Sequence, residues 1–216
     1  MTKYLIINAD DFGMSRVFNK VILELIRSNL IRSTTVMIGR VTDNQKEQFD
    51  ELINLSKNKN LSVGLHLEFE NNNYDSQIKS QLQKFEEILG FNPSHIDIHK
   101  VHSLMDSVPI VAKFCKELNV PLRNSGVTFN DIKTTFSKAF FGSITDFNKI
   151  KKWIKTFEDE KYYEILFHPG EYDLNCKSSL NKDRERDINH IKDLNSILKE
   201  NSIKLVSYFD LAKLKN

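Results

Sequence analysis

Short apolar runs alternate with longer segments of helical period along the chain, and this alternation constrains the fold more than any other feature. The first apolar run is Tyr4–Ile7, and after Ser15 apolar residues recur every three or four positions up to Asn29. Strands that alternate with helices indicate parallel β–α–β units. The pattern predicts strands at Tyr4–Ile7, Thr34–Ile38, Leu61–Leu67, Ile96–Ile98, Val120–Arg123, Tyr163–Phe167 and Lys204–Val206.

We therefore expect an α/β fold, a single-domain distorted or incomplete (β/α) barrel with about seven parallel strands. A doubly wound open sheet is the alternative. No linker rich in proline, glycine or serine divides the chain, so one domain is expected over residues 1–216. Segment 128–142 has no clear period. Helices are expected at 15–29, 44–57, 77–89, 108–118, 147–158 and 184–199.

Composition excludes several classes of protein. With 40% hydrophobic and 28% charged residues, the chain is neither disordered, collagen-like nor a coiled coil. A net charge of +2 gives no reason to expect a nucleic-acid partner. Two cysteines without a framework indicate reduced thiols, and no leader or membrane-length apolar run stands out, so a cytoplasmic protein without a membrane partner is expected. A homodimer is expected on base rates.

Polar residues that can hold a metal ion or carry a proton follow four of the predicted strands. Asp10 and Asp11 end the first strand, His66 lies near the end of the third, and His99 and His168 follow two later strands. The carboxyl ends of parallel strands form one rim, where such folds place their catalytic groups. Each residue also has a structural interpretation, as a helix-capping turn, a core histidine or a turn histidine.

The strand His95-Ile96-Asp97-Ile98-His99 is the sharpest of these signals. Alternation places His95, Asp97 and His99 on one face, and buried polar residues are costly unless they are paired or bind something. His99 should reach furthest into the rim, Asp97 could orient a ligating imidazole, and His95 is expected to be structural. His102 in the following loop fits a role in the site and a solvated loop position equally well.

Together, one carboxylate and two histidines from three strands make an open site that suits a catalytic divalent ion such as Zn, Fe, Mn or Co. The spare aspartate and histidine would then supply a base and an acid. Arg123 could pair with a carboxylate of the rim or be a plain surface arginine, and His190 among charged residues is expected at the surface.

Several strings of the sequence resemble those of a known family, the YdjC-like carbohydrate deacetylases, which are distant relatives of the NodB-type polysaccharide deacetylases. The resemblance runs in order from residue 5 to about residue 172, with one more string near the end. It implies a distorted (β/α) barrel with one divalent ion, and hydrolysis of the N-acetyl group of an acetylated amino sugar or chitin-type oligosaccharide. The strings are Asn8–Ser15, Ser33–Met37, Val63–Leu67, Pro93–His99, Phe167–Gly170 and Ser207–Asp210.

The resemblance also implies roles by position. Asp11, His66 and His99 match the metal ligands, Asp10 the catalytic base and His168 the general acid. We expect Mg²⁺ or Zn²⁺, with Mn²⁺ or Co²⁺ as alternatives. Supporting or substrate-binding roles are expected for Asp97, His102 and Arg123, the last matching loosely an arginine that flanks the base in the broader superfamily.

The chain departs from the family pattern in two places. One residue fewer than usual separates His99 from His102, which leaves the role of His102 open, and the segment 68–77 after the third strand is short. The short segment leaves open a catalytically inactive protein that binds a sugar or a metal ion. A metal-dependent phosphoesterase on a similar barrel is a second alternative.

Overall fold

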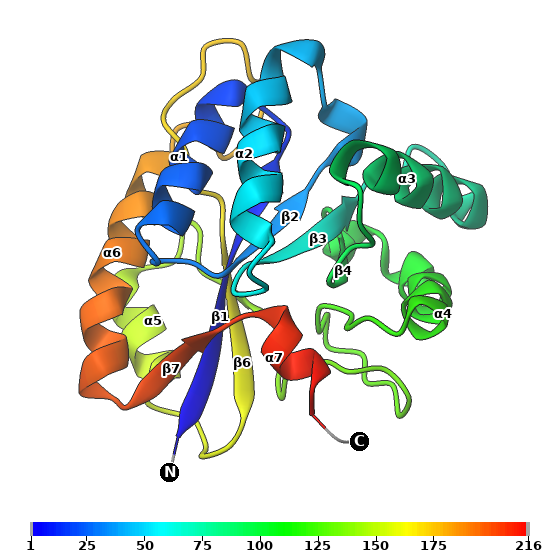
Figure 1. The fold of residues 1–216 in the computed structure, drawn as a ribbon. Coiled ribbons are helices and arrows are strands. Elements are labelled where there is room, and N and C mark those ends of the chain that lie inside the picture. Colours follow the sequence, from blue (N-terminus) through cyan, green and yellow to red (C-terminus); the bar gives the residue numbers. More distant parts are fainter. Residues whose placement is uncertain (1, 215–216) are drawn as a thin grey trace.

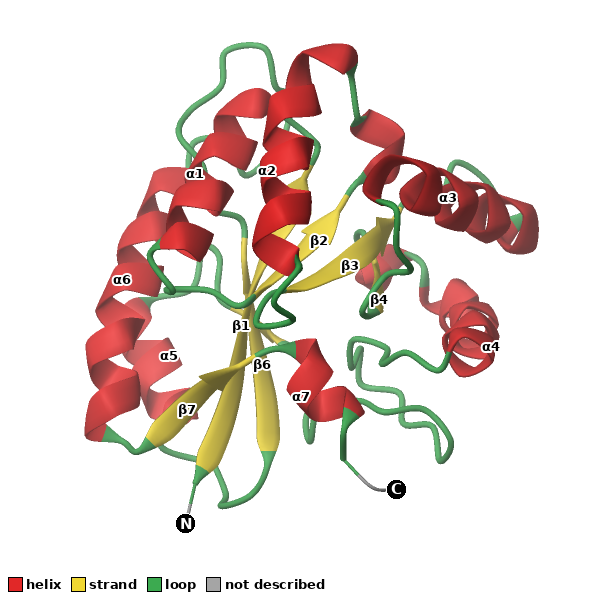
Figure 2. Ribbon diagram, in the orientation of Figure 1, coloured by secondary structure: helices red, strands yellow, loops and turns green. Residues whose placement is uncertain are grey.

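A computed structural model describes residues 2–214 and contains a curled sheet surrounded by helices (Figures 1 and 2). Within these residues the sheet has seven strands, in the order β4-β3-β2-β1-β6-β5, with β7 also paired to β1, and every pair is parallel. The expected distorted barrel of about seven parallel strands is confirmed. The strands are β1 (Lys3–Phe12), β2 (Ser33–Val36), β3 (Ser62–Leu67), β4 (Ile96–Ile98), β5 (Phe140–Phe141), β6 (Tyr162–Phe167) and β7 (Ile203–Val206).

Strand β1 lies at the centre of this sheet. Its residues 3–6 pair with β7 and its residues 8–12 pair with β2 on the same side, while β6 runs along its other side. Alternation sends Leu5, Ile7 and Ala9 into the main hydrophobic core. Ile6 joins a second cluster with Tyr208. Because β1 has neighbours on both sides, its carboxyl end is placed in the middle of the rim.

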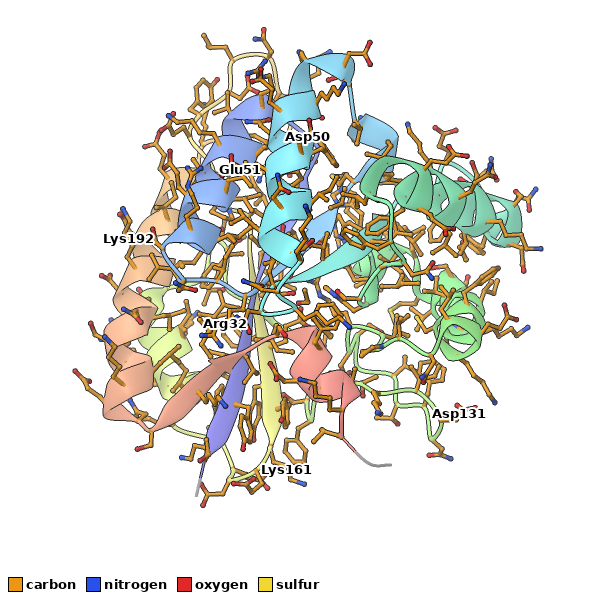
Figure 3. The ribbon with its side chains drawn as sticks, in the orientation of Figure 1. Arg32, Asp50, Glu51, Asp131, Lys161 and Lys192 are labelled. Atoms are coloured by element: carbon orange, nitrogen blue, oxygen red, sulfur yellow. The ribbon has the colours of Figure 1, made fainter. Side chains whose placement is uncertain are left out.

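Most of the helices cover the outer face of the sheet (Figure 2), and many of their polar side chains face outward, as Asp50 on α2 and Lys192 on α6 illustrate (Figure 3). Ser15 caps α1 by accepting a hydrogen bond from the amide of Val17. Gly90 ends α3 at a φ of 76°, in the left-handed region where glycine is unstrained. The helices are α1 (Arg16–Arg27), α2 (Lys46–Ser56), α3 (Tyr74–Leu89), α4 (Val108–Leu118), α5 (Phe147–Ile154), α6 (Arg184–Glu200) and α7 (Tyr208–Ala212).

Two local predictions were wrong. The segment Val120–Arg123 is not a strand and forms a single bridge, between Leu122 and Ile96. The fifth strand of the chain is instead β5, which lies in the segment 128–142 that has no clear period. His190 is buried, because its ring stacks on Phe147 with 5.0 Å between the centroids. None of the helices in residues 2–214 has the length and apolar character needed to span a membrane.

Candidate functional site

The candidate site is a cleft of about 1020 Å³ at the carboxyl ends of the strands. Strand β1 runs upward from the N-terminus in Figure 1, so this rim lies in the upper half of that view. Asp97 lies beside the cleft, with one carboxylate oxygen 2.6 Å from His66 Nδ1. The structure brings the other seven predicted residues to the cleft wall: Asp10, Asp11, His66, His99, His102, Arg123 and His168.

Three side chains from three strand ends face one point of this cleft. Asp11 Oδ1 lies 3.6 Å from His66 Nε2 and 3.9 Å from His99 Nδ1, and the two ring nitrogens are 3.0 Å apart. Asp11 has a φ of 72°, which is uncommon for a residue with a side chain and turns its carboxylate away from the pleat of β1. Two adjacent aspartates can therefore point in different directions from one strand end.

The donor atoms of this group fit a divalent cation. Asp11 Oδ1 is buried and has no hydrogen-bond partner among the described residues. His66 Nδ1 is engaged by Asp97 Oδ1, so Nε2 is the ring nitrogen that faces the group, as in many metal-ligating histidines. A carboxylate oxygen and two imidazole nitrogens suit Zn²⁺ and several other divalent ions.

The two imidazoles differ in pKa, and together they hold a proton that a bound cation would displace. Burial lowers the pKa of His66, but Asp97 and the neighbouring carboxylates outweigh this and raise it to about 9. Burial and the charge of His66 lower the pKa of His99 to about 4. One proton therefore lies between the two rings at neutral pH, where a bound cation would take its place.

The carboxylate of Asp10 points toward Arg123, in a different direction from that of Asp11. The guanidinium donates two hydrogen bonds to it, with Nη2 2.8 Å from Oδ1 and Nη1 2.9 Å from Oδ2. Thr35 and Asn8 donate to Oδ1 at 2.8 and 2.6 Å. Burial acts to raise the pKa of Asp10, but Arg123 and the nearby histidines hold it well below its usual range. Asp10 is therefore an ionised carboxylate, and its Oδ2 lies 3.8 Å from His168 Nε2.

Arg123 is buried, so the alternative of a surface arginine is wrong. It also donates to Asp97 and, through Nε at 2.9 Å, to Glu164 in the middle of β6. Glu164 accepts a further hydrogen bond of 2.5 Å from the hydroxyl of Tyr208 on α7. Sequence reasoning missed Glu164 and Tyr208, although a glutamate inside an apolar strand was a signal that a buried cation would be needed.

The charges around this centre do not balance within the protein. Four buried carboxylates surround it with two buried guanidiniums and the protonated ring of His66, so an excess of negative charge remains that a cation would offset. These groups are Asp10, Asp11, Asp97 and Glu164 on the acidic side and Arg123 and Arg184 on the basic side.

His168 is held by two residues that sequence reasoning also missed. Ser143 Oγ donates to the carboxylate of Asp187 and lies 2.9 Å from His168 Nδ1. A carboxylate can only accept, so the hydroxyl proton goes to Asp187 and the oxygen accepts from His168 Nδ1–H. Asp187 also accepts from the backbone amide of His168 at 2.9 Å. This chain of hydrogen bonds fixes the ring so that Nε2 faces the cleft.

The two remaining histidines differ in position. His102 lies exposed in the 3-10 turn Val101–Ser103, where it lines the cleft and an adjoining apolar cavity of about 240 Å³. His95 is buried below the rim and stacks on Tyr208 at 3.7 Å, in agreement with its expected structural role. The ring of His95 occupies the space beside Gly64, so that this glycine makes room for His95 and not for His66.

This constellation coincides with a match to a known family. The model of the family described as YdjC-like protein matches residues 4–76 and 70–201. The chain belongs to this family. Its Asp10, Asp11, His66, His99, Arg123 and His168 all lie within the matched residues.

Curated relatives of this family member carry names that refer to sugar deacetylation. A carbohydrate deacetylase of Clostridium beijerinckii is 28% identical over 249 residues, covering 96% of this chain and 99% of the relative. A chitooligosaccharide deacetylase of Escherichia fergusonii is 28% identical over 263 residues, covering 98% of this chain and all of the relative. Both alignments are longer than the 216 residues of this chain, so the relatives contain insertions.

Solved structures share the fold at low sequence identity. A protein of Enterococcus faecalis named for cellobiose-phosphate cleavage superposes with a TM-score of 0.80 at 20% identity, covering 98% of this chain and 99% of that one. A family 4 acetyl xylan esterase of Clostridium thermocellum, solved with a cobalt ion, gives a TM-score of 0.54 at 15% identity, covering 97% and 90%. At these identities the likeness supports the fold alone.

Proposed function

We propose that this protein is a metal-dependent hydrolase that removes the N-acetyl group from an acetylated amino sugar or chitin-type oligosaccharide. One observation carries the proposal: Asp11 Oδ1, His66 Nε2 and His99 Nδ1 converge in a cleft in which Asp10 and His168 face each other at 3.8 Å. A ligand group beside an acid–base pair is the arrangement that hydrolysis of an unreactive amide needs. The deacetylase names of the relatives support the choice of substrate.

In this proposal Asp11, His66 and His99 hold one divalent ion. Held by these three residues, such an ion would supply a Lewis acid for the acyl carbonyl and for the attacking water. We propose Mg²⁺ or Zn²⁺ as the resident ion, with Mn²⁺ or Co²⁺ as alternatives, because a mixed nitrogen and oxygen set accepts several ions. Adding each ion back to the stripped protein and measuring acetate release identifies the one that works best.

The two protein groups beside the ion divide the proton transfers. Asp10 is ionised, so its Oδ2 accepts a proton from the attacking water while Arg123 keeps the carboxylate in place. His168 Nε2 then gives a proton to the nitrogen of the departing amine. An amine leaves poorly without that proton, so this second transfer is essential to the reaction.

The decisive experiment separates the ligand group from the acid. Acetate release from N-acetylglucosamine oligomers is measured with and without a chelator, and metal content is measured by elemental analysis. His168→Ala is expected to keep its metal and lose turnover by about 10²–10⁴-fold. Asp11→Ala and His66→Ala are expected to lose the metal. Full metal occupancy in both ligand variants, or loss of metal in His168→Ala, contradicts the assignment.

The phosphoesterase alternative ranks lower because of the position of Arg123. That reaction commonly uses a second ion about 3.5–4 Å from the first. The second group of close ligand atoms in the described residues is Asp10, His66 and Asp97, and Arg123 donates hydrogen bonds to both of its carboxylates. The guanidinium thus supplies the positive charge that a second ion would bring. Phosphate release from sugar phosphates would favour this alternative, and tight sugar binding without turnover would favour an inactive binding protein.

A further inference from the structure

Arg184 is a fully buried cation beside the candidate site, at the first residue of α6, with an exposed fraction of 0%. Its Nη2 donates to Asp11 Oδ2 at 2.5 Å, and its guanidinium lies 3.8 Å above the centre of the Phe18 ring. Burying an arginine is costly unless the charge is paired and hydrogen-bonded. The pairing with Asp11 is therefore a built feature of the fold.

The two oxygens of Asp11 are treated differently by the protein. Oδ2 is held by Arg184, whereas Oδ1 is buried without a hydrogen-bond partner among residues 2–214 and faces His66 and His99. A free carboxylate can rotate or present both oxygens to a cation. With Arg184 on Oδ2, only Oδ1 is available to the ligand group.

We infer that Arg184 is a positioning residue that occupies Asp11 Oδ2 and so makes Asp11 a one-oxygen ligand with a fixed orientation. The inference rests on the proposed function, because it assumes that Asp11, His66 and His99 bind a divalent ion. Charge-assisted hydrogen bonds between arginine and a carboxylate are short and directional, which suits such a role. Groups that orient a ligand from behind commonly affect metal affinity by about 10–100-fold.

Arg184 also connects the ligand to the proposed acid. Its Nη1 donates to the backbone carbonyl of His168 at 3.3 Å, and Nη2 donates to Ser178 Oγ at 3.1 Å in the segment before α6. The side chain of Arg184 is closely packed against Gly170 and Phe18. A Cβ added to Gly170 would lie 3.2 Å from Arg184 Cδ and 2.6 Å from the Phe18 ring. One immobile guanidinium therefore sets the spacing between Asp11 and the end of β6.

The test measures metal binding directly. Zn²⁺ and Co²⁺ dissociation constants are determined by competition with a chelator, and the visible absorption of bound Co²⁺ reports its coordination. Arg184→Met is expected to weaken binding of both ions by about 10–100-fold and to change the Co²⁺ spectrum, because Asp11 can then offer both oxygens. Arg184→Lys is expected to lose less affinity, since an ammonium can still neutralise Oδ2 but cannot also reach the His168 carbonyl.

Arg186→Met is the matched control, because Arg186 lies in the same helical turn, is half-buried and pairs with Asp183 instead of a residue of the site. Its dissociation constants and Co²⁺ spectrum are expected to equal those of the wild-type protein. Circular dichroism establishes that each variant folds, and if Arg184→Met does not, Arg184→Lys carries the test through its spectrum. A folded Arg184 variant with wild-type metal affinity and spectrum would overturn this inference alone. Failure of the wild-type protein to bind either ion would overturn the proposed function and this inference with it.

Discussion

Replacement of Arg123 by methionine tests the charge arrangement beneath the site. Arg123 is the hydrogen-bonded cation for Asp10, Asp97 and Glu164, all of which are nearly or fully buried. Methionine has a similar length but no charge, so three carboxylates would lose their partner. Removing one member of a buried ion pair costs about 3–5 kcal/mol. We expect Arg123→Met to lower the free energy of unfolding at pH 7 by at least that amount.

The loss should depend on pH, and its sign follows from Asp10. Arg123 holds the folded-state pKa of Asp10 below its unfolded value of 3.8, against the effect of burial. That carboxylate therefore stabilises the wild-type fold above about pH 4, and the contribution disappears as the pH falls through the lowered pKa. In Arg123→Met the largest opposing charge is gone, so burial raises the pKa of Asp10 relative to the wild-type protein. The difference between variant and wild type is thus largest at pH 7 and shrinks toward pH 4.

Urea unfolding at pH 7 and pH 4, with a chelator present throughout, measures both differences. Arg27→Met removes an exposed pair with Glu51 and is expected to change little at either pH. Adding Glu164→Gln to Arg123→Met removes one uncompensated carboxylate and should restore part of the stability. A loss below about 1 kcal/mol at pH 7, or an equal loss at both pH values, would refute the reasoning.

Three further predictions concern the imidazoles and one glycine. Zn²⁺ binding at pH 7 should release about one proton, because burial lowers the pKa of His66 but the surrounding carboxylates raise it to about 9. Calorimetry in buffers of different ionisation enthalpy measures the protons released, and a result of no released proton would contradict this. Ser143→Ala should lower kcat and alter its pH profile without changing metal affinity, because it cuts the hydrogen bond to His168 Nδ1; an unchanged profile counts against the role. Gly64→Ala should lower stability by about 1–3 kcal/mol in thermal unfolding, because its Cβ would lie 2.4 Å from the His95 ring; an unchanged melting temperature would show that the ring can move.

The sequence alone was sufficient for the parts of the fold that depend on local period. The β–α alternation predicted the sheet, and the left-handed end of α3 at Gly90 follows from glycine's freedom at positive φ. It also predicted which strand ends would meet, because Asp11, His66 and His99 all lie at the carboxyl ends of parallel strands. Their roles in binding and catalysis remain predictions.

Features that depend on long-range packing could not be predicted. The strand β5 is two residues long and, within residues 2–214, pairs with β6 alone, so no period marks it. Arg184 and Asp187 lie in a charged run that is typical of a solvent-facing helix turn, and their burial arises from Asp11 and Ser143, more than 40 residues away in the sequence. His190 was misassigned for the same reason, since its partner Phe147 comes from another helix.

The central place of β1 has a consequence for how this molecule folds. Tyr4 pairs with Tyr162 on one side and with Lys204 on the other, so the first strand must wait for two distant segments before both of its edges are covered. Pairings across such long loops form slowly. Asp10 and Asp11 are carried on that strand, so their contacts with His168 and Arg184 form only when the C-terminal segments pack against it, and intermediates that contain only β1 to β4 should bind a cation weakly. Refolding followed by stopped-flow Co²⁺ absorption would show metal capture as a late kinetic phase.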